Sequence, residues 1–231
     1  FQALSSNEFE QIANDSGAIV LDTRNAEDFA NGHIPNSIFI GIDGGFAPWV
    51  GAIIADVNQP LLIVSDIDRE KEVITRLSRV GFDNVLGYLD GGFSTWRKED
   101  KAIEKIERID AIDLEREFTE NVKVIDVRKP GEYAAEHIED AYSKPLSQIN
   151  DWTKNIDSNG PIYIHCAGGY RSMIAASILK SRTNVQMKEV RGGFGAISNT
   201  TIPKTNFVCP SKVLHASLGK VVLSMSRTRL T

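Results

Sequence analysis

A chain of 231 residues is long enough for one large domain or for two domains of about a hundred residues each. Its 26 lysines and arginines against 31 aspartates and glutamates give a net charge of -5, which argues against nucleic-acid binding driven by phosphate neutralisation. No apolar run approaches the roughly 18 residues that cross a bilayer, so the composition predicts a soluble protein without a membrane partner.

The predicted elements alternate between helices and short apolar strands. In the first half they are, in chain order, a helix over 6–14, a strand over 18–23, a helical turn over 28–33, a strand over 61–65, a helix over 70–81 and a strand around Val85. In the second half they are a helix over 112–118, a strand over 122–127, a helical turn over 132–137, a strand over 162–166, a helix over 171–181 and a strand within 185–190. Ser6 and Asp110 are positioned as caps of the two opening helices.

The order of elements repeats because the sequence itself repeats. The segment "VLDTRNAEDFANGHIPNS" (20–37) aligns without a gap with "VIDVRKPGEYAAEHIEDA" (124–141). A second match places "NQPLLIV" (58–64) over "NGPIYIH" (159–165). The repeating unit is therefore about 100 residues long.

The repeat predicts two α/β domains, residues 1–104 and 105–209, followed by a tail over 210–231. Short apolar strands that alternate with helices indicate a parallel sheet with helices on both faces of each domain. The charged stretch over 97–108 suits an exposed connection between the domains. The tail is basic and lies outside the repeat, and its role stays open.

The chain has two cysteines, Cys166 and Cys209, which are too few for a disulfide framework. A reducing, cytoplasmic location is therefore expected. Cys209 has no counterpart in the first copy and is expected to be an incidental thiol. Because the sequence starts at Phe1, without an initiator methionine or a signal pattern, we expect a fragment or a processed form of a longer chain.

Cys166 lies at the junction of a predicted strand and a predicted helix, in "IHCAGGYRS" (164–172). Gly168 and Gly169 allow backbone angles that a β-carbon would penalise, so the amides of this loop can turn inward. Inward amides at a helix N-terminus, together with the guanidinium of Arg171, would stabilise a thiolate.

Two further side chains of this loop are polar or aromatic. The hydroxyl of Ser172 can contribute a hydrogen bond, and Tyr170 either lines the substrate mouth or covers the loop. The alternative for Cys166 itself is a small buried apolar side chain without chemistry.

The sequence Cys, four residues, Arg, Ser after a strand resembles the active-site loop of the rhodanese family of sulfurtransferases. The resemblance extends to the Asp-x-Arg at 126–128, to "EHIEDA" (136–141), where family members commonly carry Gly-His-Ile-Pro-Gly-Ala, and to the closing "RGGF" (191–194). It implies two tandem rhodanese-like domains. Loops of the tyrosine-phosphatase type place five residues between Cys and Arg instead of four.

The resemblance assigns catalysis to Cys166, which would carry a sulfane sulfur as a persulfide, and to Arg171. It assigns substrate binding to the remaining loop residues, Ala167, Gly168, Gly169, Tyr170 and Ser172. The expected donor is thiosulfate or a glutathione persulfide, and the expected acceptor is a thiol or cyanide. Similar tandem repeats follow metallo-β-lactamase-fold domains, so a metallo-hydrolase domain in the full-length protein is an expected partner.

The first copy reads "VSDIDRE" (64–70) at the loop, and we place Asp66 at the position of Cys166. No thiol remains there, and Asp66 and Asp68 would repel an anionic sulfur donor. The first domain is therefore predicted to be inactive. A solvated acidic turn is a better interpretation of these carboxylates than a cation site.

Residues present in both copies are predicted to be structural, because one copy lacks the nucleophile: Asp22, Arg24 and His33, with Asp126, Arg128 and His137. His165 precedes Cys166 on a strand and should point to the opposite face. The histidines do not cluster, so no metal and no other cofactor is expected.

Two other functions stay open. One is a docking or regulatory module without catalysis, which a buried Cys166 would favour. The other is a phosphatase or arsenate reductase using the same nucleophile, which the four-residue spacing disfavours.

Overall fold

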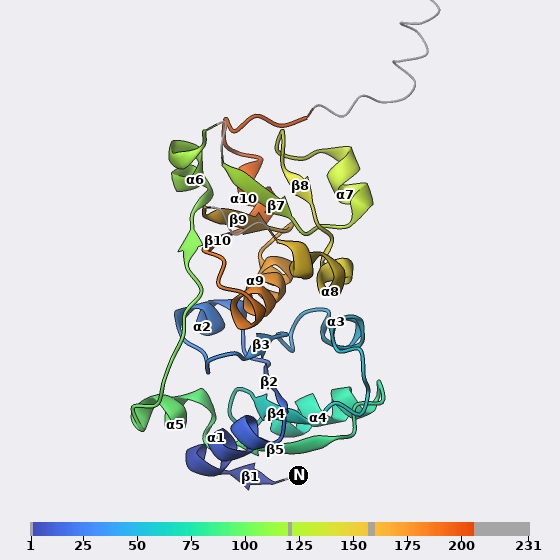
Figure 1. Cartoon of the computed structure of the whole chain (residues 1–231), viewed down its shortest axis with the longest axis vertical. Helices are drawn as coiled ribbons and strands as arrows, with labels where there is room; N and C mark the ends of the chain where they lie inside the picture. Colours follow the sequence, from blue (N-terminus) through green and yellow to red (C-terminus); the bar gives the residue numbers. More distant parts are fainter. Residues whose placement is uncertain (1, 120–121, 157–159, 206–231) are drawn as a thin grey trace, which may run out of the picture.

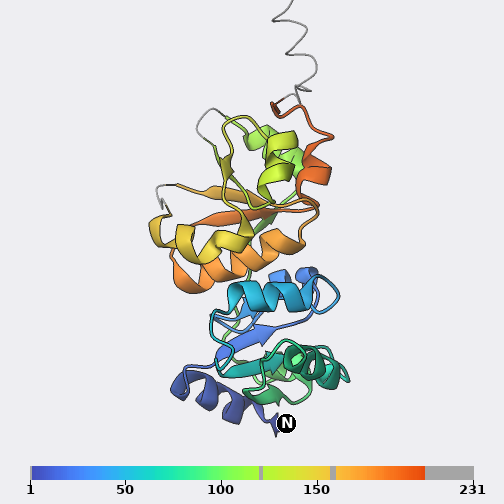
Figure 2. The same ribbon diagram turned by 90° about the vertical axis from the view of Figure 1, so that its right-hand side faces the viewer.

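The computed structural model describes residues 2–119, 122–156 and 160–205. Two five-stranded sheets follow one another along the long axis of the molecule, one from each half of the chain (Figure 1). In the view turned by 90°, helices flank each sheet (Figure 2). The predicted pair of α/β domains with parallel sheets is confirmed.

The first sheet has the strand order β1-β5-β4-β2-β3. Its strands are β1 (Ala3–Leu4), β2 (Ile19–Asp22), β3 (Ile38–Phe39), β4 (Leu61–Val64) and β5 (Val85–Leu89). The helices between them are α1 (Ser6–Asp15), α2 (Ala26–Asn31), α3 (Phe46–Ile53), α4 (Glu70–Ser78) and α5 (Gly92–Lys98).

The second sheet repeats this order as β6-β10-β9-β7-β8. Its strands are β6 (Arg108–Ile109), β7 (Lys123–Asp126), β8 (Tyr142–Ser143), β9 (Ile162–His165) and β10 (Met187–Val190). Its helices are α6 (Ala111–Glu117), α7 (Pro130–Ala135), α8 (Ile149–Trp152), α9 (Tyr170–Arg182) and α10 (Gly193–Ile197), with short 3₁₀ turns at Leu146–Gln148 and Thr153–Asn155.

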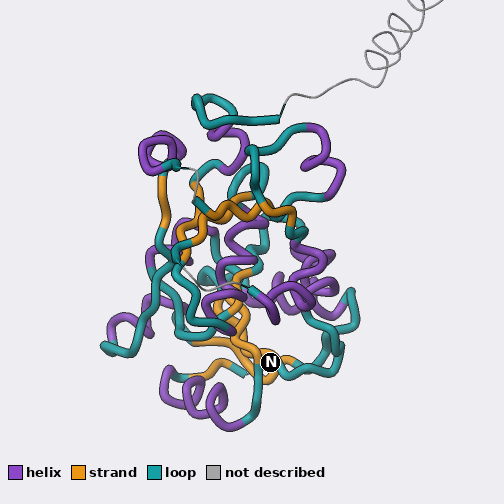
Figure 3. The backbone as a smooth tube through the Cα atoms, turned by 45° about the horizontal axis from the view of Figure 1, so that its top comes forward, coloured by secondary structure: helices purple, strands orange, loops and turns teal. Residues whose placement is uncertain are grey.

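The central strands β4 and β9 are buried over their whole length, as expected for parallel strands covered on both faces. Successive side chains of a strand point to opposite faces, and the core is layered accordingly. Ile63 of β4 and Ile164 of β9 belong to one apolar layer that lies between the two sheets. Leu62 and Tyr163 belong to separate outer layers, one for each domain. The two domains therefore share a core, and the strands gather inside a shell of helices (Figure 3).

Of the two predicted helix caps, one is confirmed and the other is wrong. Asp110 is the N-cap of α6, although its side chain makes no capping hydrogen bond. Ser6 as the cap of α1 is wrong, since Ser5 occupies that position. The Ser5 N–H donates to the Glu8 carboxylate at 2.9 Å and the Ser5 hydroxyl oxygen accepts from the Glu8 N–H at 3.4 Å, a reciprocal capping box. Ser6 is buried, and its hydroxyl contacts Glu99.

Within the described ranges, no helix combines the length and the apolar composition that spanning a membrane requires. In the same ranges, His, Cys, Asp and Glu side chains do not gather into groups of three or more able to hold a metal ion. Cys209 and the tail over 210–231 lie outside the described residues.

Candidate active site

Cys166 is the first residue after β9, and α9 begins four residues later at Tyr170. Strand β9 lies between β10 and β7, so the loop between them sits at the middle of the carboxyl edge of the second sheet. This edge is where parallel α/β sheets bind ligands. The cysteine loop therefore lies where it is predicted, at the junction of a strand and a helix.

The thiol sulfur has two polar neighbours. The Gly169 N–H donates to Cys166 Sγ at 3.1 Å, and Ser172 Oγ lies 3.4 Å from the same sulfur. Gly169 has a φ of 106°, which a β-carbon would penalise. Gly168 has no positive φ, and a β-carbon on it would meet no heavy atom within 4 Å. Of the two glycines predicted to allow such angles, Gly169 adopts one and Gly168 does not.

Cys166 itself is 1 % exposed and belongs to the apolar layer between the sheets. This burial is the observation that would favour a docking module over an enzyme. The Sγ atom nevertheless accepts the Gly169 N–H, a hydrogen bond that an inert apolar cysteine does not need. The site is a buried thiol in a polar cradle.

Arg171 is held by a carboxylate of the neighbouring helix. Its two terminal nitrogens donate to Glu132 of α7 at 2.6 and 2.8 Å, a bidentate pair. The Arg171 hydrogen bond lowers the pKa of Glu132 to about 2. The hydrogen bonds to Glu132 also raise the pKa of Arg171, and burial opposes that rise.

Tyr170 closes the loop against the first domain. Its hydroxyl donates to the Gly41 carbonyl at 2.7 Å, and its ring packs edge-on against Phe39 with centroids 5.8 Å apart. Burial raises the pKa of Tyr170. Tyr170 therefore covers the loop, which is one of the two positions predicted for it.

A buried carboxylate that sequence reasoning missed lies behind the loop. Glu189 of β10 is 0 % exposed, and its Oε1 accepts from Ser172 Oγ at 2.6 Å. Its Oε2 accepts from Arg108 Nε of β6 at 2.8 Å. Burial raises the pKa of Glu189, and the hydrogen bonds from Ser172 and Arg108 oppose that rise. Strand β10 reads Met-Lys-Glu-Val, so its sequence does not single out Glu189 as the buried charge.

His165 is fully buried and does not reach the sulfur. Its Nδ1 lies 3.2 Å from the Cys166 carbonyl oxygen, and its Nε2 lies 3.9 Å from Asp126. No hydrogen-bond partner of Nε2 is found among the described residues. Burial lowers the pKa of His165, so its neutral form is favoured.

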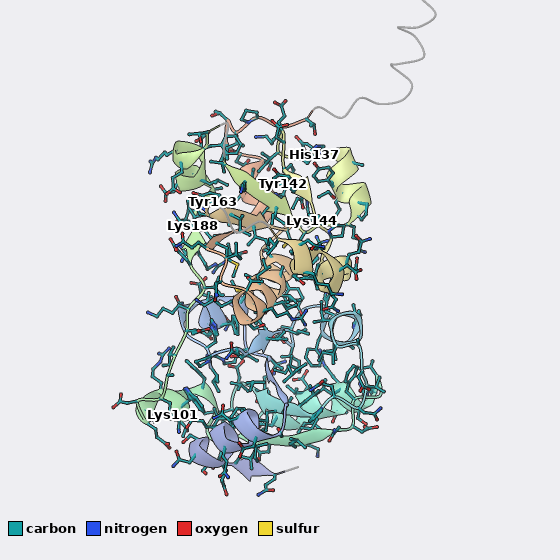
Figure 4. All side chains as sticks on the ribbon, viewed as in Figure 1. Lys101, His137, Tyr142, Lys144, Tyr163 and Lys188 are labelled. Atoms are coloured by element: carbon teal, nitrogen blue, oxygen red, sulfur yellow. The ribbon has the colours of Figure 1, made fainter. Side chains whose placement is uncertain are left out.

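The features shared by both copies have the same geometry in each. Asp22 and Asp126 hold the guanidinium of the arginine two residues on, each with a shortest distance of 2.6 Å. His33 Nδ1 contacts the Phe29 carbonyl at 2.9 Å and His137 Nδ1 the Tyr133 carbonyl at 2.7 Å. His137 lies at the end of the second domain away from the first (Figure 4). The geometry is that of a repeated local framework.

One predicted correspondence between the copies is wrong. The ladders pair Asp22 with Val64 and Asp126 with His165, so Ser65, not Asp66, occupies the position of Cys166. The turns before α5 and α10 agree, because Gly92 approaches the Ser65 carbonyl as Gly193 approaches the Cys166 carbonyl. The match of 58–64 with 159–165 continues into the loop without a gap, and Asp68 and Gly169, both with a positive φ, then coincide.

Ser65 lines a cavity of about 630 Å³ at the carboxyl edge of the first sheet. Asp66 lines the same cavity and is exposed. The first copy therefore keeps a hollow at the equivalent edge, with a hydroxyl in place of the thiol.

Comparison with known proteins adds an independent result. The family model described as "Rhodanese-like domain" matches residues 5–99 and 110–200. The uncharacterised protein YqhL of Bacillus subtilis is 35% identical over 72 residues, which are 31% of this chain and 57% of that protein. Thiosulfate sulfurtransferase GlpE of Shewanella oneidensis is 31% identical over 99 residues, 42% of this chain and 94% of that enzyme.

A solved structure, thiosulfate sulfurtransferase from Pseudomonas aeruginosa, aligns with 90% of this chain and 44% of its own length, at 18% identity and a TM-score of 0.39. The match thus spans just over half of YqhL and less than half of this solved chain.

Proposed function

This chain belongs to the rhodanese-like domain family, and we propose that it is a sulfurtransferase that carries a sulfane sulfur as a persulfide on Cys166. The sulfurtransferase class rests on the family match in both halves and on relatives named thiosulfate sulfurtransferase. The assignment of Cys166 rests on one observation above all. Its Sγ lies at the carboxyl edge of the second sheet with the Gly169 N–H directed at it.

In the proposed cycle, the Cys166 thiolate attacks the outer sulfur of thiosulfate. A bond forms between Sγ and that sulfur, the sulfur–sulfur bond of thiosulfate breaks, and sulfite leaves with the electron pair. A thiol or cyanide then attacks the terminal sulfur of the persulfide and returns Cys166 as a thiolate. The Gly169 N–H and the Ser172 hydroxyl would stabilise the sulfur anion in both steps.

The same proposal makes the first domain inactive in sulfur transfer. Ser65 stands where the thiol would be, and an alcohol is a far weaker nucleophile than a thiolate at neutral pH. The carboxylates of Asp66 and Asp68 follow it in the loop and would repel an anionic donor. A glutathione persulfide as the natural donor and a metallo-hydrolase domain as a partner stay predictions.

A docking module without catalysis is the second candidate, and the 1 % exposure of Cys166 favours it. A persulfide-forming cysteine must meet a donor, so the loop has to admit one from the outside. The two candidates therefore differ in a measurable property, the uptake of sulfur by Cys166.

The deciding experiment is intact-mass measurement after incubation with thiosulfate or glutathione persulfide, followed by cyanide. We expect the wild-type chain to gain a single sulfur that cyanide removes, Cys209→Ser to do the same, and Cys166→Ser to gain none. Uptake by Cys166→Ser would move the chemistry to another residue. No uptake by the wild type from either donor would favour the docking module.

A further inference from the structure

The buried carboxylate of Glu189 lies one side chain away from the sulfur. Removing a carboxylate from water costs several kcal/mol unless other groups pair with it. Two groups do so here, Arg108 Nε at 2.8 Å and Ser172 Oγ at 2.6 Å. Ser172 is itself buried and also lies 3.4 Å from Cys166 Sγ. One hydroxyl thus bridges the thiol and the carboxylate.

The distances fix the direction of the hydrogen bonds. The hydroxyl of Ser172 has one proton and three acceptors near it, Glu189 Oε1 at 2.6 Å, the Gly169 carbonyl at 3.1 Å and Cys166 Sγ at 3.4 Å. When Glu189 is ionised, its Oε1 is both the nearest and the strongest acceptor of the three. With that proton directed at Glu189, a lone pair of Ser172 Oγ is free to accept the thiol proton.

The comparison of the two copies separates this arrangement from the shared framework. The strand registers place Ala3 and Tyr88 of the first domain where the second has Arg108 and Glu189. The match of 58–64 with 159–165, continued along the chain, places Lys71 where the second domain has Ser172. The chain of polar groups is therefore present only in the copy that has the cysteine, as expected for a part of the chemistry and not of the fold.

We propose that Glu189 takes the thiol proton of Cys166 through the hydroxyl of Ser172. The S–H bond breaks and its proton bonds to Ser172 Oγ, while the original hydroxyl proton passes to Glu189 Oε1. Sulfur keeps the electron pair and becomes the thiolate that the proposed sulfur transfer requires. The proton now on Ser172 lies between Oγ and Sγ, so the hydroxyl donates to the new anion.

The charges around Glu189 are compatible with this role. Arg108 of β6 contacts it, and Arg191, just after β10, acts on it from farther away. Neither removes the effect of burial, which raises the pKa of Glu189. A raised pKa lets a carboxyl hold a proton at a pH at which an exposed one has lost it.

The first test needs no sulfur transfer, so it stays decisive if the proposed function fails. The ultraviolet absorbance of the Cys166 thiolate is followed against pH in the Cys209→Ser protein. The absorbance of the same protein with the additional substitution Cys166→Ser is subtracted. We expect two steps, because Cys166 and Glu189 share a proton and titrate as a pair. In Glu189→Gln we expect one step. An identical single step in both proteins would overturn the proposal.

The second test keeps the buried ion pair and removes only the bridge. Ser172→Ala should slow sulfur loading by about a hundredfold at acid pH, and the deficit should shrink as pH rises and hydroxide replaces the relay. Ser181→Ala is the matched control on the same helix, since among the described residues its hydroxyl donates to the Ile178 carbonyl, at 3.0 Å. We expect the control to load sulfur like the wild type at every pH. A deficit in Ser172→Ala that is equal at all pH values would indicate a structural role and contradict the relay.

Discussion

Arg171 illustrates how a single residue of the loop is shared between two tasks. The family resemblance assigns it to the reacting anion, whereas both of its terminal nitrogens are engaged by Glu132. With the pKa of Glu132 near 2, this carboxylate stays ionised across ordinary assay conditions. In the proposed reaction, thiosulfate would therefore meet a guanidinium that is already partly neutralised.

Replacing Glu132 by Gln should strengthen the binding of anionic donors. The freed charge of Arg171 attracts thiosulfate more strongly, so KM for thiosulfate should fall by a factor of about 3 to 10. Steady-state kinetics at low salt measure it, with Glu136→Gln, an exposed carboxylate just after the same helix, as the control. A raised KM would mean that Glu132 positions Arg171 more than it neutralises it.

The sequence alone predicts a site residue when its signal lies within one short motif. Cys166 and Gly169 follow from one loop motif, and the loop has the predicted place in the fold. Glu189 and Arg108 are 81 positions apart and meet only because β6 pairs with β10. No local pattern carries that pairing. The misplaced Asp66 is a different case, because the match of 58–64 with 159–165 already places Ser65 opposite Cys166, as the strand ladders confirm.

At the scale of elements, the turn before α10 holds the cysteine loop in place. The Phe194 N–H donates to the Cys166 carbonyl at 2.7 Å, and the Gly195 N–H donates to the Ala167 carbonyl at 3.0 Å. Gly193, with a φ of 54°, lets the two segments approach each other. The "RGGF" motif thus supports the loop by backbone contact, a role that the motif as a sequence does not reveal.

The substitution Gly193→Ala should therefore disturb the cysteine loop, although it lies in a different turn. A β-carbon there would overlap the Cys166 carbonyl, and the positive φ adds strain, so we expect a loss of about 1–3 kcal/mol in the free energy of unfolding. Sulfur loading should fall with it. Urea denaturation and the mass assay measure the two effects. Gly131→Ala, whose β-carbon would meet nothing within 4 Å, is the control, and equal behaviour of both variants would contradict the supporting role.

The long and short elements differ in how well the sequence predicts them. The buried strands β4 and β9 and the amphipathic helix α4 have clear apolar patterns, and each lies where it is predicted. The two-residue edge strands β3 and β8 have none, because so short a segment is defined by its neighbour and not by its own periodicity. The helical turns begin earlier than predicted. Asn25 caps α2, and Pro130 opens α7.

At the scale of the whole molecule, helix α9 is part of the second domain and also contacts the first. It begins at the cysteine loop, and its Ser177 hydroxyl oxygen accepts the Phe39 N–H of edge strand β3 in the first domain at 3.0 Å. Tyr170, the first residue of α9, bonds to the Gly41 carbonyl of the same domain. The domain without the cysteine therefore forms part of the wall around the thiol, which gives the first copy a structural reason to be present.

Gly44→Ala tests whether this contact between the domains matters for the site. A β-carbon at Gly44 would overlap the Tyr170 ring, which must then move together with the start of α9. We expect the free energy of unfolding, measured by urea denaturation, to fall by about 1–3 kcal/mol. Sulfur loading of Cys166 should also slow, although the substitution lies in the other domain. Gly51→Ala, in helix α3 with open space around its β-carbon, should leave both properties unchanged or slightly raise stability. Lower stability with unaltered sulfur loading would show that Tyr170 joins the domains without controlling the loop, because the strain would then be absorbed before it reaches Gly169.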